Sequence, residues 1–175
     1  MYPVYTSTYE RFDGIPNNDR SRSQAYLARK AQWVQDTLRA LDYLETRDDV
    51  DAERTGYWGL SWGAEIAPIT LAIDERLRAA VLMDAGALLV PVLPQADEAH
   101  FVPRVAVPVL MINGRYDYVF PVETAQRPFF ELLGTPDDQK THELFDSGHV
   151  VVATYFDAAM ELMVDWLDET FGPVR

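Results

Sequence analysis

Cysteine is absent from the 175 residues of this chain. Disulfides, thiolate nucleophiles and cysteine metal sites are therefore excluded. Long hydrophobic runs are absent too, because the chain has no stretch of about eighteen consecutive apolar residues, the length of a membrane helix. Residues 1–5 also lack the basic region and long apolar run of a secretory signal. We therefore expect no membrane segment and a cytoplasmic location.

Basic residues are scarce, with 15 Lys+Arg against 28 Asp+Glu and a net charge of −13. This balance argues against nucleic-acid partners, because neutralisation of phosphates by Lys and Arg drives such binding. Three dispersed histidines without cysteine give a zinc or iron site little support, and we expect no metal and no cofactor. The length and the 48% share of hydrophobic residues fit one domain over 1–175.

Apolar patterning predicts strands that alternate with helices. The expected strands lie at 2–8, 55–59, 79–83, 107–113 and 142–145, and helical spacing marks 27–44, 64–73, 122–133 and 156–167. Residues 87–107 show no clean period, and we expect an irregular segment there that caps the site. The alternation predicts an α/β fold with a parallel sheet covered on both faces, whose active groups gather at the carboxyl ends of the strands.

One stretch, Gly59-Leu60-Ser61-Trp62-Gly63, fits the G-x-S-x-G nucleophile elbow. A short apolar run precedes it and apolar residues at helical spacing follow it, so strand, sharp turn and helix occur in the order that an elbow requires. The alternative is a tight strand-to-helix turn with an incidental serine. The backbone N–H of Trp62, directly after the serine, would be one oxyanion donor; the second donor is not visible in this chain.

Ser61, Asp117 and His149 each follow a predicted strand, in the order serine, acid, histidine. A serine hydroxyl is a poor nucleophile until a neutral imidazole takes its proton, and a carboxylate must orient that imidazole. Parallel strands would deliver all three to one edge of the sheet. A catalytic triad is therefore predicted, against the alternative that His149 is a surface turn residue.

Other residues compete for these roles. Asp84 ends the preceding strand and is the rival acid, whereas Asp146 fits a turn former. The remaining polar candidates have no partner at a recognisable spacing or are not placed like a base: Glu10, Glu65, His100 and His142. The aromatic residues beside the acid either line an acyl pocket or pack against the next helix: Tyr116, Tyr118 and Phe120.

Four pieces of the chain carry a family resemblance: Pro3 to Arg11, Gly59 to Pro68, Phe101 to Val151, and Asp165 to Val174. They resemble bacterial serine hydrolase domains of the α/β-hydrolase superfamily, related to dienelactone hydrolases and acetyl xylan esterases and often fused behind a protein kinase. At matching positions the family's nucleophile, acid and base are Ser61, Asp117 and His149. The resemblance implies hydrolysis of an ester.

The resemblance also implies that the first strands of an α/β-hydrolase are lacking, because that fold has eight strands and we expect about five here. If 2–6 is the fourth strand, the third would normally lie between it and the elbow strand. Residues 2–6 should then either pair beside 57–59 or stand apart. An open sheet edge would invite cover by a second copy or by an N-terminal half.

The sequence thus predicts a serine hydrolase, a carboxylesterase acting on a small ester. The rival is a weakly active or non-catalytic interaction module, or a fragment of a larger fused protein, which the lacking strands favour. A flavodoxin-like binding domain is a distant third hypothesis, since no phosphate-cradling glycine loop is present.

Overall fold

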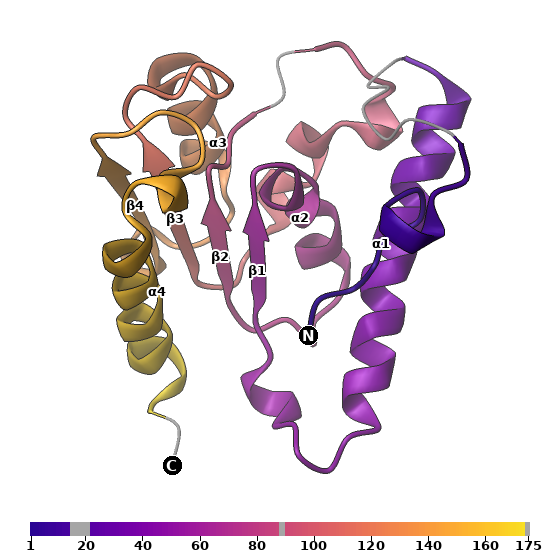
Figure 1. Ribbon diagram of the computed structural model, residues 1–175, viewed down its shortest axis with the longest axis horizontal. Coiled ribbons are helices and arrows are strands. Elements are labelled where there is room, and N and C mark those ends of the chain that lie inside the picture. The colour runs from indigo at the N-terminus through magenta and orange to yellow at the C-terminus, as the bar shows by residue number, and fades with distance from the viewer. Residues whose placement is uncertain (15–21, 88–89, 174–175) are drawn as a thin grey trace.

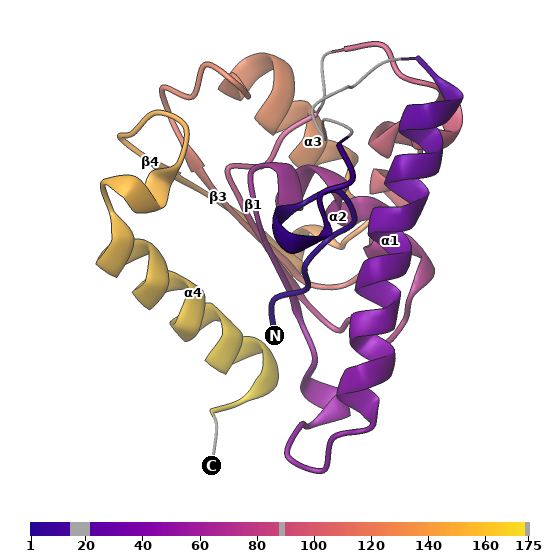
Figure 2. The same cartoon turned by 45° about the vertical axis from the view of Figure 1, so that its right-hand side comes forward.

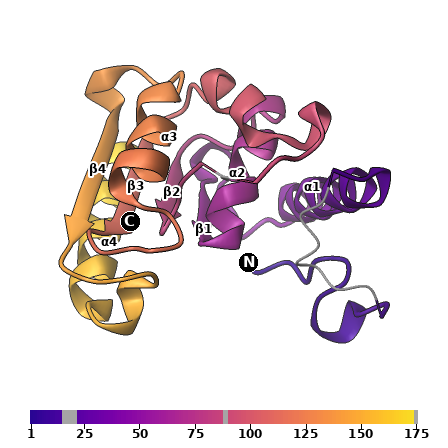
Figure 3. The ribbon, with the colours of Figure 1, turned by 90° about the horizontal axis from the view of Figure 1, so that it is seen from above.

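The computed structural model describes residues 1–14, 22–87 and 90–173. Four strands form one sheet in the order β1-β2-β3-β4, and every neighbouring pair is parallel. The sheet is twisted, and each strand ends at the edge that lies uppermost in Figure 1. Seen from above, the strands follow one another from β4 to β1, with helix α1 beyond β1 (Figure 3). The strands are β1 (Tyr57–Leu60), β2 (Ala80–Met83), β3 (Val109–Gly114) and β4 (Lys140–Phe145).

Helices cover both faces of the sheet, as the alternating pattern predicts. The main helices are α1 (Gln24–Glu45), α2 (Trp62–Ile73), α3 (Arg127–Leu132) and α4 (Phe156–Phe171). Helices α1, α2 and α3 lie on one side of the sheet and α4 lies on the other (Figure 2). The predicted helix at 122–133 begins as a π-helical turn, Val122–Gln126, before it continues as α3.

Alternation along the central strands divides the core into two layers. Successive residues of a strand point to opposite faces, so Leu82 and Met111 pack toward α2 and α3, whereas Met83 and Ile112 pack toward α4. All residues of β2 and β3 are buried. These two strands read as continuous apolar runs because helices cover both of their faces.

The expected strand at 2–8 does not form, which corrects that prediction. Residues 2–6 have no strand pairing and stand apart from β1, whose one bonded neighbour in the described part of the chain is β2. Polar groups of α1 replace a sheet partner: the Thr6 N–H donates to Asp36 at 2.7 Å, and the indole N–H of Trp33 donates to the Thr6 carbonyl at 2.9 Å. The chain then turns, with the Thr8 N–H bonded to the Tyr5 carbonyl.

The outer edge of β1 is consequently open within the described residues. Tyr57 and Ser61 donate their N–H groups toward β2, to the carbonyls of Ala79 and Met83. In a parallel ladder alternate residues direct their backbone groups to opposite sides, so Trp58 and Leu60 direct theirs toward the open edge. A hollow of about 120 Å³ is lined by residues of both parts, with Met1, Pro3 and Tyr5 from the N-terminal segment and Thr55 to Trp58 at this edge.

The irregular segment expected at 87–107 forms three short 3₁₀ turns, Pro94–Ala96, Glu98–His100 and Val102–Arg104, with residues 88 and 89 outside the described part. It is tied to α1 by a buried ion pair between Lys30 and Glu98. Val102 belongs to the core. The described helices include none long and apolar enough to span a bilayer.

Candidate active site

The turn after β1 places Ser61 in a backbone conformation that few non-glycine residues adopt. Its φ is +50° and its ψ is −106°, and α2 begins at the next residue. The Ser61 N–H still donates to the Met83 carbonyl at 2.8 Å, while its own carbonyl accepts from the Glu65 N–H in the first turn of α2. Strand and helix hydrogen bonds therefore meet at this residue and hold the strained turn.

Gly59 makes this turn possible because a side chain there has no room. A Cβ on Gly59 would lie 2.6 Å from the Gly63 carbonyl carbon, a backbone atom that cannot step aside. A Cβ on Gly63, by contrast, would meet only the Tyr57 hydroxyl, at 4.0 Å. Lack of space therefore requires glycine at position 59 but not at position 63.

The loop after β3 fixes Asp117. One carboxylate oxygen, Oδ1, accepts the backbone N–H groups of Val119 at 2.7 Å and Phe120 at 3.0 Å. The Asp117 side chain is fully buried. Because two backbone donors hold Oδ1, the second oxygen, Oδ2, points in one defined direction, toward His149.

The loop after β4 carries His149 and crosses close to the acid loop. The Tyr116 N–H donates to the Ser147 carbonyl at 2.9 Å, which ties the two loops together. A side chain on Gly114 would overlap the Gly148 carbonyl oxygen, so this crossing requires glycine at the end of β3. Directly after the histidine, Val150 has a φ of +68°, an unfavourable conformation for a β-branched residue.

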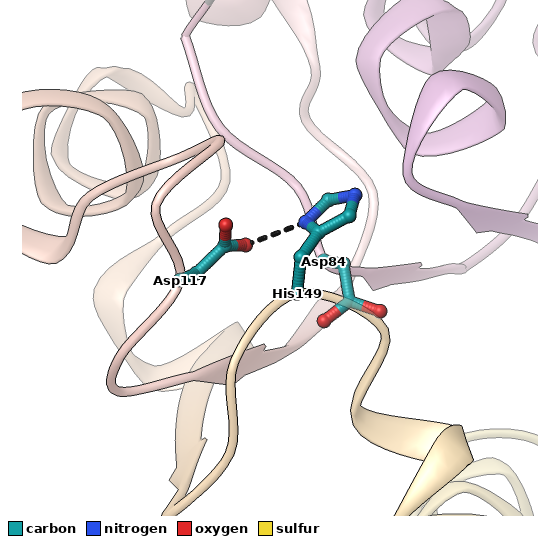
Figure 4. A group of neighbouring side chains, drawn as sticks. All are labelled: Asp84, Asp117 and His149. Carbon is teal, nitrogen blue, oxygen red and sulfur yellow. Dashed lines mark hydrogen bonds and ion pairs between the residues drawn. The ribbon is translucent and has the colours of Figure 1, made fainter.

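These three loops bring Ser61, His149 and Asp117 into a continuous hydrogen-bond chain. The Ser61 Oγ lies 2.7 Å from His149 Nε2, and His149 Nδ1 lies 2.8 Å from Asp117 Oδ2. Figure 4 shows the second of these contacts. A neutral imidazole with its proton on Nδ1 would donate to the carboxylate and leave Nε2 free to accept from the serine hydroxyl. The arrangement can move a proton from Ser61 to His149.

Asp84, the rival acid, occupies a different place beside the same histidine. It follows β2, is completely buried, and has a φ of +52°. Both of its carboxylate oxygens accept the Val151 N–H, at 3.2 Å each. Burial raises the pKa of Asp84 to about 6, although the Val151 N–H and His149 pull it down. Sequence reasoning found this residue but missed its contact with the backbone beyond His149.

Asp84, Asp117 and His149 also form the one group of three potential metal-binding side chains in the described residues, with ligand atoms within 4.8 Å of one another. Their polar atoms are already engaged, however: Nδ1 of His149 bonds Asp117, and both oxygens of Asp84 accept the Val151 N–H. A metal ion would have to break the hydrogen bond that orients the imidazole. We therefore assign no metal ligands here.

The other residues that the sequence offered for the acid, the base or the pocket are not members of the hydrogen-bond chain of Ser61, His149 and Asp117. Asp146 is exposed and pairs with Arg115 at 2.9 Å. Of the aromatic residues beside the acid, Tyr116 and Tyr118 are 67% and 83% exposed, whereas Phe120 is buried with its ring centroid 5.9 Å from that of His149. Glu10 lies in the 3₁₀ turn Tyr9–Arg11 and His100 in the turn Glu98–His100, whereas Glu65 lies in α2 and His142 in β4.

A hollow of about 340 Å³ adjoins the residue after the serine. Trp62 forms one wall, and the N-terminal segment contributes the rest: Tyr2, Tyr5, Ser7, Thr8, Tyr9 and Phe12. The Trp62 ring is held edge-on by Tyr5 and Trp33, with centroid separations of 5.4 and 4.7 Å. The aromatic lining of this hollow thus comes from Trp62 and from residues 2–12, not from the residues beside Asp117.

Comparison with known proteins gives the fold. No protein-family model matches the chain. It is 27% identical over 168 residues to the Bacillus subtilis protein "Putative hydrolase YtaP", covering 81% of this chain and 56% of that protein. Among solved structures, a zinc-bound cold-adapted esterase from an Arctic intertidal metagenomic library matches at 26% identity with a TM-score of 0.63, over 85% of this chain and 65% of the esterase. A dienelactone hydrolase-like structure from Klebsiella pneumoniae matches at 21% identity and a TM-score of 0.65, over 80% and 62%.

The chain has the α/β-hydrolase fold, and it lies close to esterase and dienelactone hydrolase-like structures. Its relative YtaP carries the name "Putative hydrolase". The chain spans a little over half of that relative's length and about two thirds of the esterase. The predicted α/β-hydrolase fold and the predicted resemblance to dienelactone hydrolase-like proteins are confirmed, with four parallel strands in the described residues where about five were expected.

Proposed function

We propose that the chain is a serine hydrolase of the carboxylesterase type that acts on a small ester. The observation that supports this proposal is the hydrogen-bond chain from Ser61 through His149 to Asp117, with both links below 3 Å. Similarity to an esterase and to a named hydrolase points to the same reaction class.

In the proposed reaction His149 Nε2 takes the proton of Ser61 as the serine oxygen attacks the ester carbonyl. Asp117 keeps the proton of His149 on Nδ1 and stabilises the imidazolium that forms. His149 then protonates the departing alcohol, which leaves an acyl group on Ser61. A water molecule, deprotonated by His149, releases the acid and restores the serine.

The tetrahedral intermediate needs hydrogen-bond donors for its negative oxygen. We assign one of them to the backbone N–H of Trp62, the first residue of α2, because the first N–H groups of a helix have no partner within that helix. The partial positive charge at a helix N-terminus favours the same negative oxygen. The second donor stays unassigned.

Reaction with a fluorophosphonate probe, together with turnover of p-nitrophenyl acetate, tests this proposal. We expect Ser61→Ala to abolish labelling and to lower turnover to the uncatalysed rate. Ser147→Ala is the matched control, since its hydroxyl donates to the neighbouring Gly148 carbonyl, and labelling should persist. Labelling that survives Ser61→Ala unchanged would remove the serine from its assigned role.

The second candidate function is an interaction module that keeps these residues without efficient turnover. The open outer edge of β1, with Trp58 47% exposed beside it, favours this candidate. Turnover no faster than that of the Ser61→Ala variant, in a protein with a cooperative unfolding transition, would select it over the esterase.

We further propose that residues 1–175 fold as one domain, with the segment 87–107 as part of it. Contacts of the described part of that segment support this: Lys30 Nζ donates to the Ala96 carbonyl at 2.9 Å, and Val102 and Val105 lie in the core between the helices and the sheet. A single unfolding transition, seen alike by far-ultraviolet circular dichroism and tryptophan fluorescence, is the expected result.

A further inference from the structure

The structure contains a second buried carboxylate beside the proposed base, and the proposed mechanism gives it no role. Asp84 has no exposed surface and follows β2, the strand between those that lead to the serine and to the acid. Its own N–H donates to the Ile112 carbonyl at 2.8 Å, so its backbone is fixed by the sheet. In Figure 4 its carboxylate and that of Asp117 lie on different sides of His149.

The carboxylate of Asp84 reaches the loop of His149 at the backbone rather than at the ring. Both oxygens accept the Val151 N–H, two residues beyond the histidine. Between them lies Val150, whose φ of +68° is unfavourable for a β-branched side chain. A strained conformation persists only where its surroundings impose it, and the charge-assisted bond to Val151 is such a restraint.

We propose that Asp84 is a positioning residue of this site: its carboxylate anchors the backbone at Val151 and so holds the imidazole of His149 in reach of Ser61 and Asp117. The proposal rests on the esterase function proposed above. It separates the two buried carboxylates by role, since Asp117 orients the ring through Nδ1 and Asp84 fixes the loop that carries the ring.

The negative charge of Asp84 has a second effect on His149, besides the anchor at Val151. The titratable groups that face Asp84 are His149, from the loop after β4, and Asp117, from the loop after β3; their ligand atoms lie within 4.8 Å. With a pKa of about 6, raised by burial, Asp84 is mainly ionised at pH 7.5. A second negative charge at this distance favours the imidazolium form of His149.

Asp84→Asn tests the proposal, because asparagine keeps the shape and one oxygen acceptor but removes the charge. We expect kcat for p-nitrophenyl acetate to fall about tenfold with KM unchanged, as for a group that acts on the reacting geometry. The acid limb of the pH profile of kcat/KM should move about one unit lower, since the imidazolium loses a neighbouring charge. Asp146→Asn, the same change at an exposed site three residues before His149, should alter neither quantity.

A purely structural role for Asp84 would lower the melting temperature and leave the acid limb in place, and that result overturns the proposal. Asp84→Ala removes the acceptor as well, and its kcat should fall below that of Asp84→Asn. If the wild-type chain shows no turnover that depends on Ser61, the esterase proposal fails separately. Hydrogen exchange at the Val151 N–H in wild type and Asp84→Asn then still decides: equal protection of this N–H in the two proteins contradicts the positioning role.

Discussion

The carboxyl ends of the strands and the outer edge of β1 are neighbouring regions built in different ways. At the strand ends, backbone hydrogen bonds link each loop to a strand or to another loop, as from Ser61 to Met83 and from Tyr116 to Ser147. At the outer edge, residues 2–6 are attached by side chains of α1, chiefly Asp36 and Trp33. The first region is fixed by the sheet itself, and the second by side-chain contacts that include the fully buried Trp33.

This difference has an energetic consequence. Buried backbone bonds between loops must be kept, because an unpaired buried N–H or carbonyl costs on the order of 1–3 kcal/mol. The contacts of the N-terminal segment include an ion pair, Arg11 to Asp36, whose arginine is 47% exposed. Exposed ion pairs contribute less than about 1 kcal/mol. Changes at the strand ends should therefore affect activity and stability far more than changes at the outer edge.

The largest effect is expected from Gly59→Ala. The new Cβ would lie 2.6 Å from the Gly63 carbonyl carbon, so the elbow has to shift; we expect a loss of about 1–3 kcal/mol in unfolding free energy and loss of fluorophosphonate labelling. Urea unfolding and labelling measure the two effects. Gly63→Ala is the control: it has room for a methyl group inside α2 and should gain stability by up to about 1 kcal/mol. Equal destabilisation by both changes would contradict this account of the elbow.

Asp117→Asn should leave the fold intact and lower kcat on the order of 10,000-fold, because the amide can donate to Nδ1 and so favour the wrong tautomer of His149. Steady-state turnover of p-nitrophenyl acetate measures the loss, and circular dichroism checks the fold. Asp146→Asn removes the same charge from an exposed position nearby and should retain turnover. If the two variants have equal activity, Asp117 does not orient the base.

A pH effect is expected from His142, in the edge strand β4 on the opposite side of the sheet from β1. Burial lowers its pKa from 6.5 to about 4, so the folded state disfavours its protonated form. The penalty is absent above pH 6.5, grows as pH falls, and is complete near pH 4. His142→Phe should therefore raise the melting temperature at pH 5 relative to wild type by more than it does at pH 7.5.

His100→Gln removes an exposed histidine and is the control for that experiment. Its difference from wild type should be the same at the two pH values. The fall in melting temperature between pH 7.5 and pH 5 should be larger for wild type than for His142→Phe. An equal fall in both proteins would show that burial of the His142 ring has no part in the pH dependence.

The smallest effect is expected from Asp36→Asn, which weakens the attachment of the N-terminal segment. Loss of charge at the acceptor of Thr6 and Arg11 should lower global stability by at most about 1 kcal/mol but increase hydrogen exchange of residues 6–12. Asp42→Asn is the matched control on the same helix, since its partners are Arg39 and Arg76. Faster exchange in both variants alike would mean that Asp36 is not the attachment point.

Much of the fold could be predicted from the pattern of apolar residues in the sequence. Buried parallel strands read as apolar runs, and β2 and β3 formed where such runs occur, within one or two residues. The segment 2–8 also has the aromatic and β-branched composition of a strand, yet it formed none. Residues with high strand propensity form a strand where their side chains can pack against neighbouring strands of a sheet. In the described residues no strand lies beside this segment.

The candidate site was predictable in its residue types and order, because each of its members follows a strand of a parallel sheet. Ser61, Asp117 and His149 lie within hydrogen-bond distance as that order predicts, and their catalytic role stays a proposal. The place of Asp84 was not predictable. Its bond to Val151 joins residues 67 positions apart and depends on how the loop after β4 turns.

The sequence by itself determined the alternation of strands and helices, the motif of the elbow, and the order of serine, acid and histidine, because these depend on neighbours along the chain. The tertiary structure decided which of two acids contacts the imidazole and which contacts the backbone, and whether residues 2–6 join the sheet. Those outcomes depend on distances between segments far apart in the chain, which local propensity and spacing do not encode.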